Sequence, residues 1–189
     1  MPKRGLKLKA GLALLVAMVA TAVAILAPAG ASAACDFGGL APSETNICAP
    51  TAKAKMLADG ELIPPAEAPA RVKAVIAAAN KIRTKPYIWG GGHASFASRG
   101  YDCSGSVSYA LHGGNFLASP LPSGPLESWG EEGEGQWITV YANAGHAYMT
   151  VAGFRFDTAG DSGIDETGPR WHEELLSNEG FVARHPAGF

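Results

Sequence analysis

A cysteine at the start of a predicted helix is the residue of this sequence best suited to chemistry. Cys103 lies in the segment Asp102-Cys103-Ser104-Gly105, where a loop turns into a helical stretch over Ser104–Leu111. The first amides of a helix lack partners and the helix dipole is positive there, so this position favours a thiolate and can hold a developing oxyanion. Asp102 fits the N-cap position and is assigned a structural role. We predict that Cys103 is a nucleophile.

The base that a cysteine nucleophile needs is predicted to be His146. This histidine begins an alternating segment directly after the turn signal Asn143-Ala144-Gly145. The alternation indicates a strand with His146, Tyr148 and Thr150 on one face. A histidine at a strand end is otherwise typical of a hydrogen-bonded structural residue, and it is the presence of a nucleophile that favours the catalytic role.

The other four histidines fit this role less well. His112 ends the helix that begins at Cys103, which places it too far along that helix for contact. His172 follows Trp171 in a predicted loop and His185 precedes a proline, so both are expected at the surface. His93 follows three glycines, and its position leaves it open as an alternative base.

The elements that must position these residues predict an α+β domain. Between Pro69 and Lys85-Pro86, which are typical start and stop signals, apolar side chains recur at helical spacing: Val72, Val75, Ile76, Ala79 and Ile82. Strands are predicted over Trp137–Tyr141, His146–Val151, Arg155–Asp157 and Phe181–Arg184. We expect the helix that carries Cys103 to pack against the antiparallel sheet that these strands form.

Three other stretches have no part in this predicted sheet. A short helix is favoured over Thr51–Leu62, and loops over Asn115–Gly135 and Ala159–Pro169. The first loop is long for a compact domain, which is typical of a functional or mobile segment. It carries Trp129, a candidate lid or substrate contact whose alternative role is packing in the core.

The segments Tyr87, Gly90-Gly91, Asp102-Cys103-Ser104-Gly105 and Gly145-His146 resemble the motif of the NlpC-type cell-wall peptidases. The resemblance extends from Val72 to Thr158. It implies a papain-like fold with a catalytic Cys–His pair. It also implies that the substrates are stem peptides of peptidoglycan, usually cut at a bond between D-glutamate and a diamino acid. The family's tyrosine near the nucleophile falls on Tyr87, which we expect to contact the substrate together with Ser104 and Trp129.

The resemblance further implies a third polar residue on the strand after the histidine. In the family this residue is commonly a second histidine, and its place falls here on Thr158, with Asp157 beside it. We choose Asp157, because a carboxylate orients and stabilises an imidazolium better than a threonine does. A two-residue turn at Ala152-Gly153 brings Asp157 within reach of His146, whereas a turn at Gly153-Phe154 leaves it too far away. We predict the first register.

The first 33 residues are predicted to be a secretory signal peptide. A basic start is followed by an apolar run over Ala10–Leu26 and by the small residues Ala31-Ser32-Ala33. An uncleaved membrane anchor is the alternative, because the apolar run approaches the length that spans a bilayer. We expect residues 34–70 to form a loop-rich segment with a disulfide, and residues 71–189 to form the peptidase domain.

Removal of the signal peptide makes the protein acidic. The segment takes four basic residues with it, so the formal net charge moves from −2 to −6. An acidic chain without a basic stripe is a poor ligand for nucleic acid, and no such partner is expected. No cofactor and no metal are expected either, because the candidate ligands Cys103, His146 and Asp157 lack close ligand spacing.

The predicted function is a secreted cysteine peptidase, extracellular or associated with the cell wall, that hydrolyses peptide bonds in peptidoglycan. No stable insertion into the membrane is expected once the signal is cleaved. The same Cys–His pair also suits an amidase or acyltransferase that acts on another secreted substrate. A non-catalytic domain that binds wall peptides is the remaining alternative, which an unpaired thiol at a helix start disfavours.

The three cysteines give the first testable prediction. Cys35 and Cys48 lie in one loop-rich stretch of an exported protein, where a disulfide between them contributes about 3 kcal/mol and leaves Cys103 alone. Exported protein should therefore show one reactive thiol before reduction and three afterwards, counted by thiol titration of the denatured chain. Three reactive thiols before reduction would exclude the disulfide.

Overall fold

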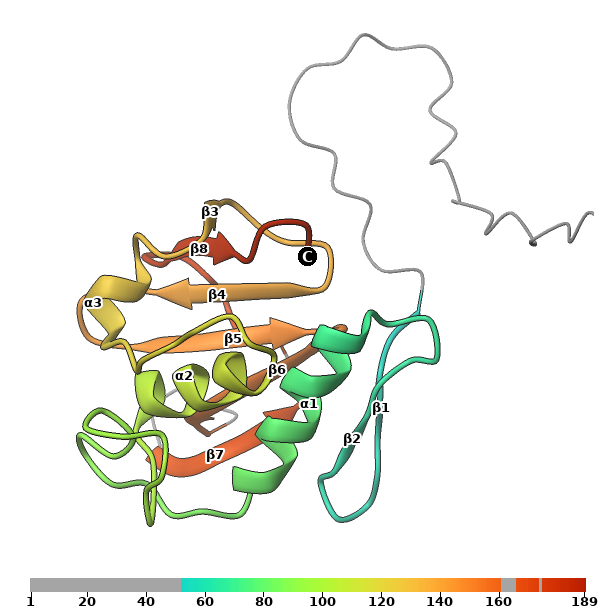
Figure 1. The fold of residues 1–189 in the computed structure, drawn as a ribbon. Helices are drawn as coiled ribbons and strands as arrows, with labels where there is room; N and C mark the ends of the chain where they lie inside the picture. The colour runs from blue at the N-terminus through green and yellow to red at the C-terminus, as the bar shows by residue number, and fades with distance from the viewer. Residues whose placement is uncertain (1–51, 161–165, 174) are drawn as a thin grey trace, which may run out of the picture. The chain divides into compact units, whose positions relative to one another are not determined.

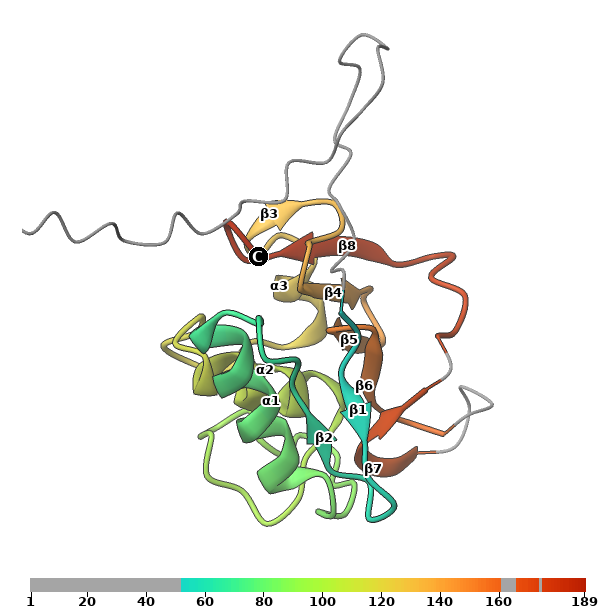
Figure 2. The same ribbon diagram turned by 90° about the vertical axis from the view of Figure 1, so that its right-hand side faces the viewer.

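The computed structural model describes residues 52–160, 166–173 and 175–189 (Figure 1). They form an α+β domain in which two helices lie on one side of an antiparallel sheet (Figure 2), so the predicted fold class is confirmed. The strand order of the sheet is β3-β8-β4-β5-β6-β7. In chain order its strands are β3 Glu131–Glu132, β4 Ile138–Ala142, β5 Ala147–Val151, β6 Phe154–Ala159, β7 Glu166–His172 and β8 Val182–His185.

Helix α1 forms where the apolar spacing predicts it. It spans Ala70–Ile82 and follows Pro69, which has the extended backbone of a residue just before a helix. Its apolar side is buried in the core and consists of Val72, Val75, Ile76, Ala79 and Ile82. The helix ends at Arg83, three residues before Pro86, because the residue preceding a proline avoids helical backbone angles.

Helix α2 carries the predicted nucleophile at its first position. It spans Cys103–Gly113, and the carboxylate of Asp102 accepts a hydrogen bond from the N–H of Gly105 at 2.8 Å. The predicted N-cap is therefore confirmed. The helix packs against α1 and against β5 and β6. Gly113 allows the two helices to approach closely, because a methyl group there would overlap Ala78.

A side-chain-stabilised turn joins β4 to β5. The side-chain oxygen of Asn143 accepts hydrogen bonds from the N–H groups of Gly145 and His146, each at 2.9 Å. An asparagine that binds its own backbone two residues further on mimics a backbone turn. This arrangement fixes the place at which His146 enters the sheet, directly before β5.

The turn between β5 and β6 decides which residues face one another. Ala152 and Gly153 occupy it with φ angles of 48° and 83°, the left-handed values that a two-residue hairpin turn requires. Val151 pairs with Phe154 across the turn. The predicted register is therefore confirmed, and its continuation sets Asp157 opposite Tyr148.

The helix predicted over Thr51–Leu62 is wrong. The chain forms an antiparallel hairpin there, with strands β1 Lys55–Met56 and β2 Leu62–Ile63. Gly60, with φ of 79°, and Asp59, whose carboxylate accepts a backbone N–H at 3.1 Å, turn the chain between them. The hairpin is held by tertiary packing, since Leu62 is fully buried in the core next to residues of α1.

Two stretches predicted as loops contain short elements. Helix α3, Ser123–Leu126, and strand β3 lie within 115–135, and β7 begins in the second stretch, extends beyond it and pairs with β6. Gly168 and Pro169 suggest a loop there, but Pro169 is tolerated because β7 is the last strand of the described sheet.

The expectation that His172 and His185 lie at the surface is also wrong. Both belong to strands and are buried, with 5% and 8% of their surface exposed. His185 Nδ1 lies 3.1 Å from the carbonyl oxygen of Gly133, which gives the buried imidazole a polar partner. Strand pairing between distant segments covers these residues, and local sequence does not reveal it.

Several predictions concern residues outside the described ones. The signal peptide, the cysteines Cys35 and Cys48 with their disulfide, and residues 34–51 of the segment 34–70 fall there. Within the described part of the chain, no helix is both long and apolar enough to span a membrane. Cys103 is a free cysteine of partial exposure.

The close approach of the glycine loop to α2 yields a stability prediction. A methyl group at Gly105 would overlap the carbonyl oxygen of Gly91, so Gly105→Ala should lower the free energy of unfolding by about 2 kcal/mol. Gly124→Ala, in α3 with open space around it, should change it by less than about 0.5 kcal/mol. Urea denaturation measures both. Equal changes in the free energy of unfolding for the two variants would show that the methyl group at position 105 causes no steric overlap.

Candidate active site

A histidine and a buried carboxylate form the centre of the site. His146 Nε2 donates a hydrogen bond to Asp157 Oδ1 at 2.9 Å. The side chain of Asp157 is 1% exposed and that of His146 is 27% exposed. The pair joins the residue directly before β5 to the middle of β6, so the register of the β5–β6 hairpin brings the two residues together.

The Asp157 carboxylate is held from several directions. Its Oδ1 atom also accepts the backbone N–H groups of Thr158 at 2.7 Å and Ala159 at 3.1 Å. Its Oδ2 atom accepts a hydrogen bond at 2.6 Å from Arg155, a guanidinium whose side chain is fully buried. A carboxylate with these donors cannot rotate, and it therefore fixes the imidazole of His146.

The side chain of the predicted nucleophile also interacts with this imidazole. The side chain of Cys103 is one of the groups that raise the pKa of His146, so the two side chains interact. Because Nε2 of His146 is bound to Asp157, Nδ1 is the ring nitrogen available to the sulfur. The structure thus joins Cys103, His146 and Asp157 in one chain of contacts, and their catalytic roles remain predictions.

The electrostatics of the trio favour an imidazolium. Burial lowers the pKa of His146, but the hydrogen bonds and charges of Asp157 and Cys103 outweigh burial and raise it to about 10. For Asp157, burial raises the pKa, and the opposing effects of His146, the Ala159 amide and Arg155 lower it below its ordinary value. At neutral pH the histidine is therefore charged and can donate a proton.

Aromatic side chains surround the histidine. The rings of Tyr148 and Phe181 each lie 6.2 Å from the imidazole, and Tyr148 stacks on Tyr141 at 5.0 Å. Burial, together with the charge of Asp157, raises the pKa of Tyr148 to about 12, so this hydroxyl stays neutral beside the site. The apolar surroundings strengthen the charged contacts of His146.

A second histidine contacts both neighbours of Cys103 in the chain. His93 Nε2 lies 3.0 Å and 2.9 Å from the two carboxylate oxygens of Asp102, and 2.9 Å from the hydroxyl oxygen of Ser104. Its side chain is 34% exposed. His93, the alternative predicted base, is thus engaged with the helix cap, whereas it is His146 whose pKa the side chain of Cys103 raises.

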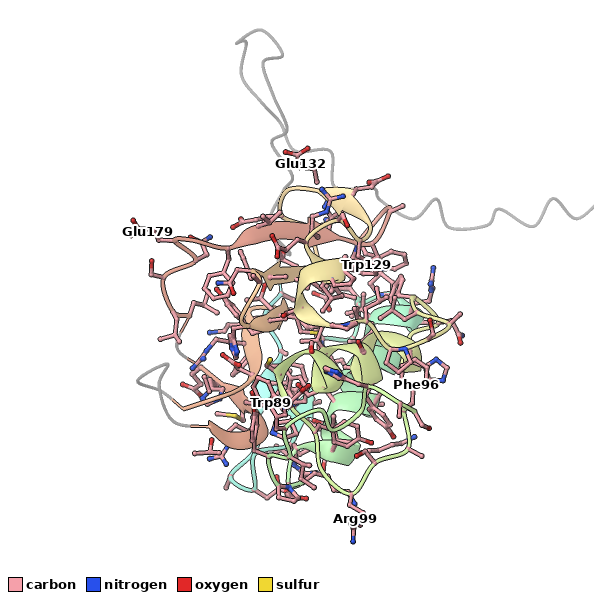
Figure 3. The ribbon with its side chains drawn as sticks, turned by 90° about the vertical axis from the view of Figure 1, so that its left-hand side faces the viewer. Trp89, Phe96, Arg99, Trp129, Glu132 and Glu179 are labelled. Atoms are coloured by element: carbon pink, nitrogen blue, oxygen red, sulfur yellow. The ribbon has the colours of Figure 1, made fainter. Side chains whose placement is uncertain are left out.

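The predicted substrate contacts lie in different surroundings. Tyr87 forms a bridge to Tyr101 just before the nucleophile, and Ser104 is buried with its hydroxyl against His93. Trp129 is partly buried against the core. Figure 3 shows it well apart from Trp89. Contact of these three residues with a substrate remains a prediction.

Sequence reasoning missed two features of the site. Trp89 is 82% exposed and precedes Gly90, whose N–H donates to Asp102 at 3.0 Å, so an aromatic ring is available to a ligand beside the helix start (Figure 3). The position of Trp89 directly before three glycines is the sequence feature that indicates an exposed ring. The second feature is Arg155, because the strand pattern over Arg155–Asp157 does not show that this side chain is buried.

The described residues hold no group of three or more His, Cys, Asp or Glu side chains that could bind a metal ion. The trio is instead arranged for proton transfer between a thiol, an imidazole and a carboxylate. That arrangement matches the one expected for nucleophilic attack on an acyl carbon, in which a predicted nucleophile interacts with a predicted base and a third group orients that base.

Comparison with known proteins gives weak similarities. Neither a known protein family nor a curated protein matches the sequence. Among solved structures, the Resuscitation Promoting Factor Interacting protein RipA is 20% identical with a TM-score of 0.43, over 61% of this chain and 62% of RipA. RipD from Mycobacterium tuberculosis, described as a non-catalytic NlpC/p60 domain protein adapted to peptidoglycan binding, is 18% identical with a TM-score of 0.44, over 62% of this chain and 98% of RipD.

An NlpC/P60 family protein from Bacillus cereus is 19% identical with a TM-score of 0.45, over 67% of this chain and 42% of that protein. The chain thus spans about three fifths of the length of RipA. RipD and the Bacillus cereus protein are described as NlpC/p60 proteins, the family whose motif the sequence resembles. At these identities and TM-scores, what the site can do rests on the geometry of its own residues.

The raised pKa of His146 gives a prediction for titration. Asp157→Asn removes the charge that stabilises the imidazolium, so the pKa of His146 should fall from about 10 toward its ordinary 6.5. Nuclear magnetic resonance of the imidazole signals measures this directly. Asp59→Asn, which removes a carboxylate paired with Arg83, should leave the titration of His146 unchanged. An unaltered titration in Asp157→Asn would show that the pair is not ionic.

The same shift has a consequence for stability. A histidine whose pKa is raised by folding contributes stability in full below its unfolded value and loses it as the pH rises through the folded value. For His146 that loss falls between pH 6.5 and about 10. Over this interval the wild type should lose stability relative to Asp157→Asn, which urea denaturation at several pH values detects.

Proposed function

We propose that this protein is a cysteine peptidase that hydrolyses peptide bonds in the stem peptides of bacterial peptidoglycan. The contact chain of Cys103, His146 and Asp157 carries the proposal, because each member has the chemical partner that its role needs. The motif around Cys103 and His146 supports the peptidoglycan substrate through its resemblance to NlpC-type peptidases. The composition of the first 33 residues supports export from the cell.

The first step is attack of the Cys103 thiolate on the carbonyl carbon of the scissile bond. The carbonyl oxygen becomes negatively charged and needs donors close to the nucleophile. In the first turn of α2, the N–H of Gly105 is bound to the Asp102 side chain and the N–H of Ser106 to the Asp102 carbonyl. The N–H groups of Cys103 and Ser104 have no acceptor within the described part of the chain, and we assign them to the oxyanion.

The proton that the reaction needs comes from His146. Since the pKa of His146 is about 10, the imidazolium is present at neutral pH and donates its Nδ1 proton to the leaving amine as the carbon–nitrogen bond breaks. The neutral imidazole then takes a proton from water, whose oxygen attacks the thioester carbon. The acid leaves, and the thiolate and imidazolium are restored.

Asp157 and Arg155 serve this sequence without touching the substrate. Asp157 keeps the imidazole oriented through Nε2 in both of its protonation states. Arg155 binds the second carboxylate oxygen and keeps Asp157 ionised within the core. Because the Asp157 carboxylate is already anchored, its side chain loses little conformational entropy when the reactive geometry forms.

Digestion of purified peptidoglycan, with fragments identified by mass spectrometry, tests the proposal. Wild-type protein should release fragments with new amino termini, and Cys103→Ala and His146→Ala should each lower the rate by at least about a thousandfold. His112→Ala removes a histidine of α2 that binds the carbonyl of Leu117, and it should keep full activity. Asp157→Ala should lower the rate well beyond about tenfold, and Asp157→Asn should retain more, since its oxygen still accepts the imidazole N–H.

Three results would contradict the proposal. Binding of peptidoglycan without cleavage would make the protein a wall-binding domain. Undiminished cleavage by Cys103→Ala would exclude the cysteine mechanism. Loss of activity in His93→Ala, together with retained activity in His146→Ala, would show that His93 and not His146 is the catalytic base.

A further inference from the structure

We infer that His93 is a positioning residue that acts on the Cys103 nucleophile through Asp102. The inference rests on the proposed role of Cys103 and adds a second histidine to it. His146 interacts with the Cys103 side chain, whereas His93 binds the carboxylate of Asp102, the residue that precedes Cys103. Its role is to disperse a negative charge that otherwise opposes the thiolate.

Asp102 creates an electrostatic conflict at the helix start. Its carboxylate caps α2 through the N–H of Gly105, and that cap is needed to begin the helix at Cys103. The same carboxylate belongs to the residue next to the thiol and is 5% exposed, so water screens its charge poorly. A negative charge on the residue next to the nucleophile opposes a second negative charge on the sulfur.

The structure surrounds this carboxylate with donors. Oδ1 accepts the N–H of Gly105 at 2.8 Å, and Oδ2 accepts the N–H of Gly90 at 3.0 Å. His93 Nε2 lies within 3.0 Å of both oxygens, and the hydroxyl of Ser104 lies 3.4 Å from Oδ1. His93 is the only one of these donors that can carry a positive charge, and its nitrogen bridges both oxygens.

The backbone of the glycine loop, Gly90-Gly91-Gly92, places His93 next to Asp102. The carbonyl of Gly91 accepts the N–H of Asp102 at 3.2 Å, which ties the loop to the residue before the nucleophile. A side chain at Gly92, where φ is 89°, would clash with Tyr101 and with the backbone of Gly105. Glycine is therefore required for the loop to lie against α2, and His93 follows directly.

The charged groups around Cys103 then fall into two sets. On the side of β5 and β6, His146 interacts electrostatically with Cys103 and is paired with Asp157, which Arg155 binds in turn, and the neutral Tyr148 lies beside it. From the helix start and the glycine loop, Asp102 and His93 face each other. The first set attracts negative charge to the sulfur, and the second set reduces the repulsion that the helix cap imposes.

A double-mutant cycle of thiol reactivity tests the inference without any peptidoglycan. The pH dependence of iodoacetamide alkylation at Cys103, followed by mass spectrometry of its peptide, is compared in wild type, His93→Leu, Asp102→Asn and the double variant. His93→Leu should move the alkylation midpoint up by about one pH unit, a tenfold loss of reactivity below the midpoint. In the Asp102→Asn background, where no carboxylate charge remains, the same substitution should move it by less than about 0.2 units.

Further variants separate positioning from folding. His93→Gln keeps a donor at the end of the side chain and should show an intermediate midpoint, so it carries the test if His93→Leu does not fold. His112→Leu serves as the control. His112 lies on α2, the helix that begins at Cys103, but it stacks on Phe96, so its replacement should leave the alkylation midpoint unchanged. Equal shifts by His93→Leu in both backgrounds, or no shift in the wild-type background, would overturn the inference.

These outcomes are independent of the proposed function. Normal peptidoglycan cleavage without coupling between residues 93 and 102 rejects the role of His93 alone. Clear coupling in a protein that cleaves no peptidoglycan rejects the peptidase and keeps His93 as a positioning residue for a reactive thiol that serves another acyl substrate.

Discussion

The ionised carboxylate of Asp157 inside the domain is the constraint on which the rest of the site depends. A buried charge is strongly destabilising unless paired and hydrogen-bonded, and this one receives a guanidinium, an imidazole and two backbone amides. Arg155 is fully buried in turn, so the core accepts two charged side chains where apolar ones would pack as well. This is costly for folding, and it fixes the plane and tautomer of His146. The two buried charged side chains of β6, Arg155 and Asp157, thus hold the imidazole of His146 in place at a cost in folding stability.

Local sequence was sufficient for the parts of the site that depend on short-range rules. The apolar spacing of α1, the cap at Asp102 and the two-residue turn at Ala152-Gly153 each follow from neighbours along the chain, and the turn alone decides that Asp157 reaches His146. The missed features depend on distant segments. The β1–β2 hairpin, the strand β7 and the burial of His172 and His185 arise from pairing with parts of the chain that local patterns do not identify. Arg155 belongs to the same class, because only the assembled sheet covers it.

The choice between the two candidate histidines shows what geometry adds to sequence. Both His93 and His146 bind an aspartate at about the same distance, so the presence of a His–Asp pair does not identify the base. The difference lies in what else each aspartate does. Asp102 is committed to the start of α2 through Gly105, whereas Asp157 has no structural cap to form and is anchored by Arg155. The histidine joined to the anchored carboxylate also has its pKa raised by the side chain of Cys103, and that combination distinguishes His146.

The causes of the high pKa of His146 also explain how one residue can serve as acid and then as base in the proposed reaction. Two partners raise this pKa, the carboxylate of Asp157 and the side chain of Cys103. In the free enzyme both act, and the imidazolium is ready to protonate the leaving amine. Once Cys103 is acylated, its sulfur carries no negative charge, and only Asp157 continues to stabilise the imidazolium. The pKa of His146 must then fall, so that a neutral imidazole becomes accessible at the step in which water has to be deprotonated. Because the sulfur regains its charge when the acid leaves, the proton affinity of His146 rises again and the starting state is restored.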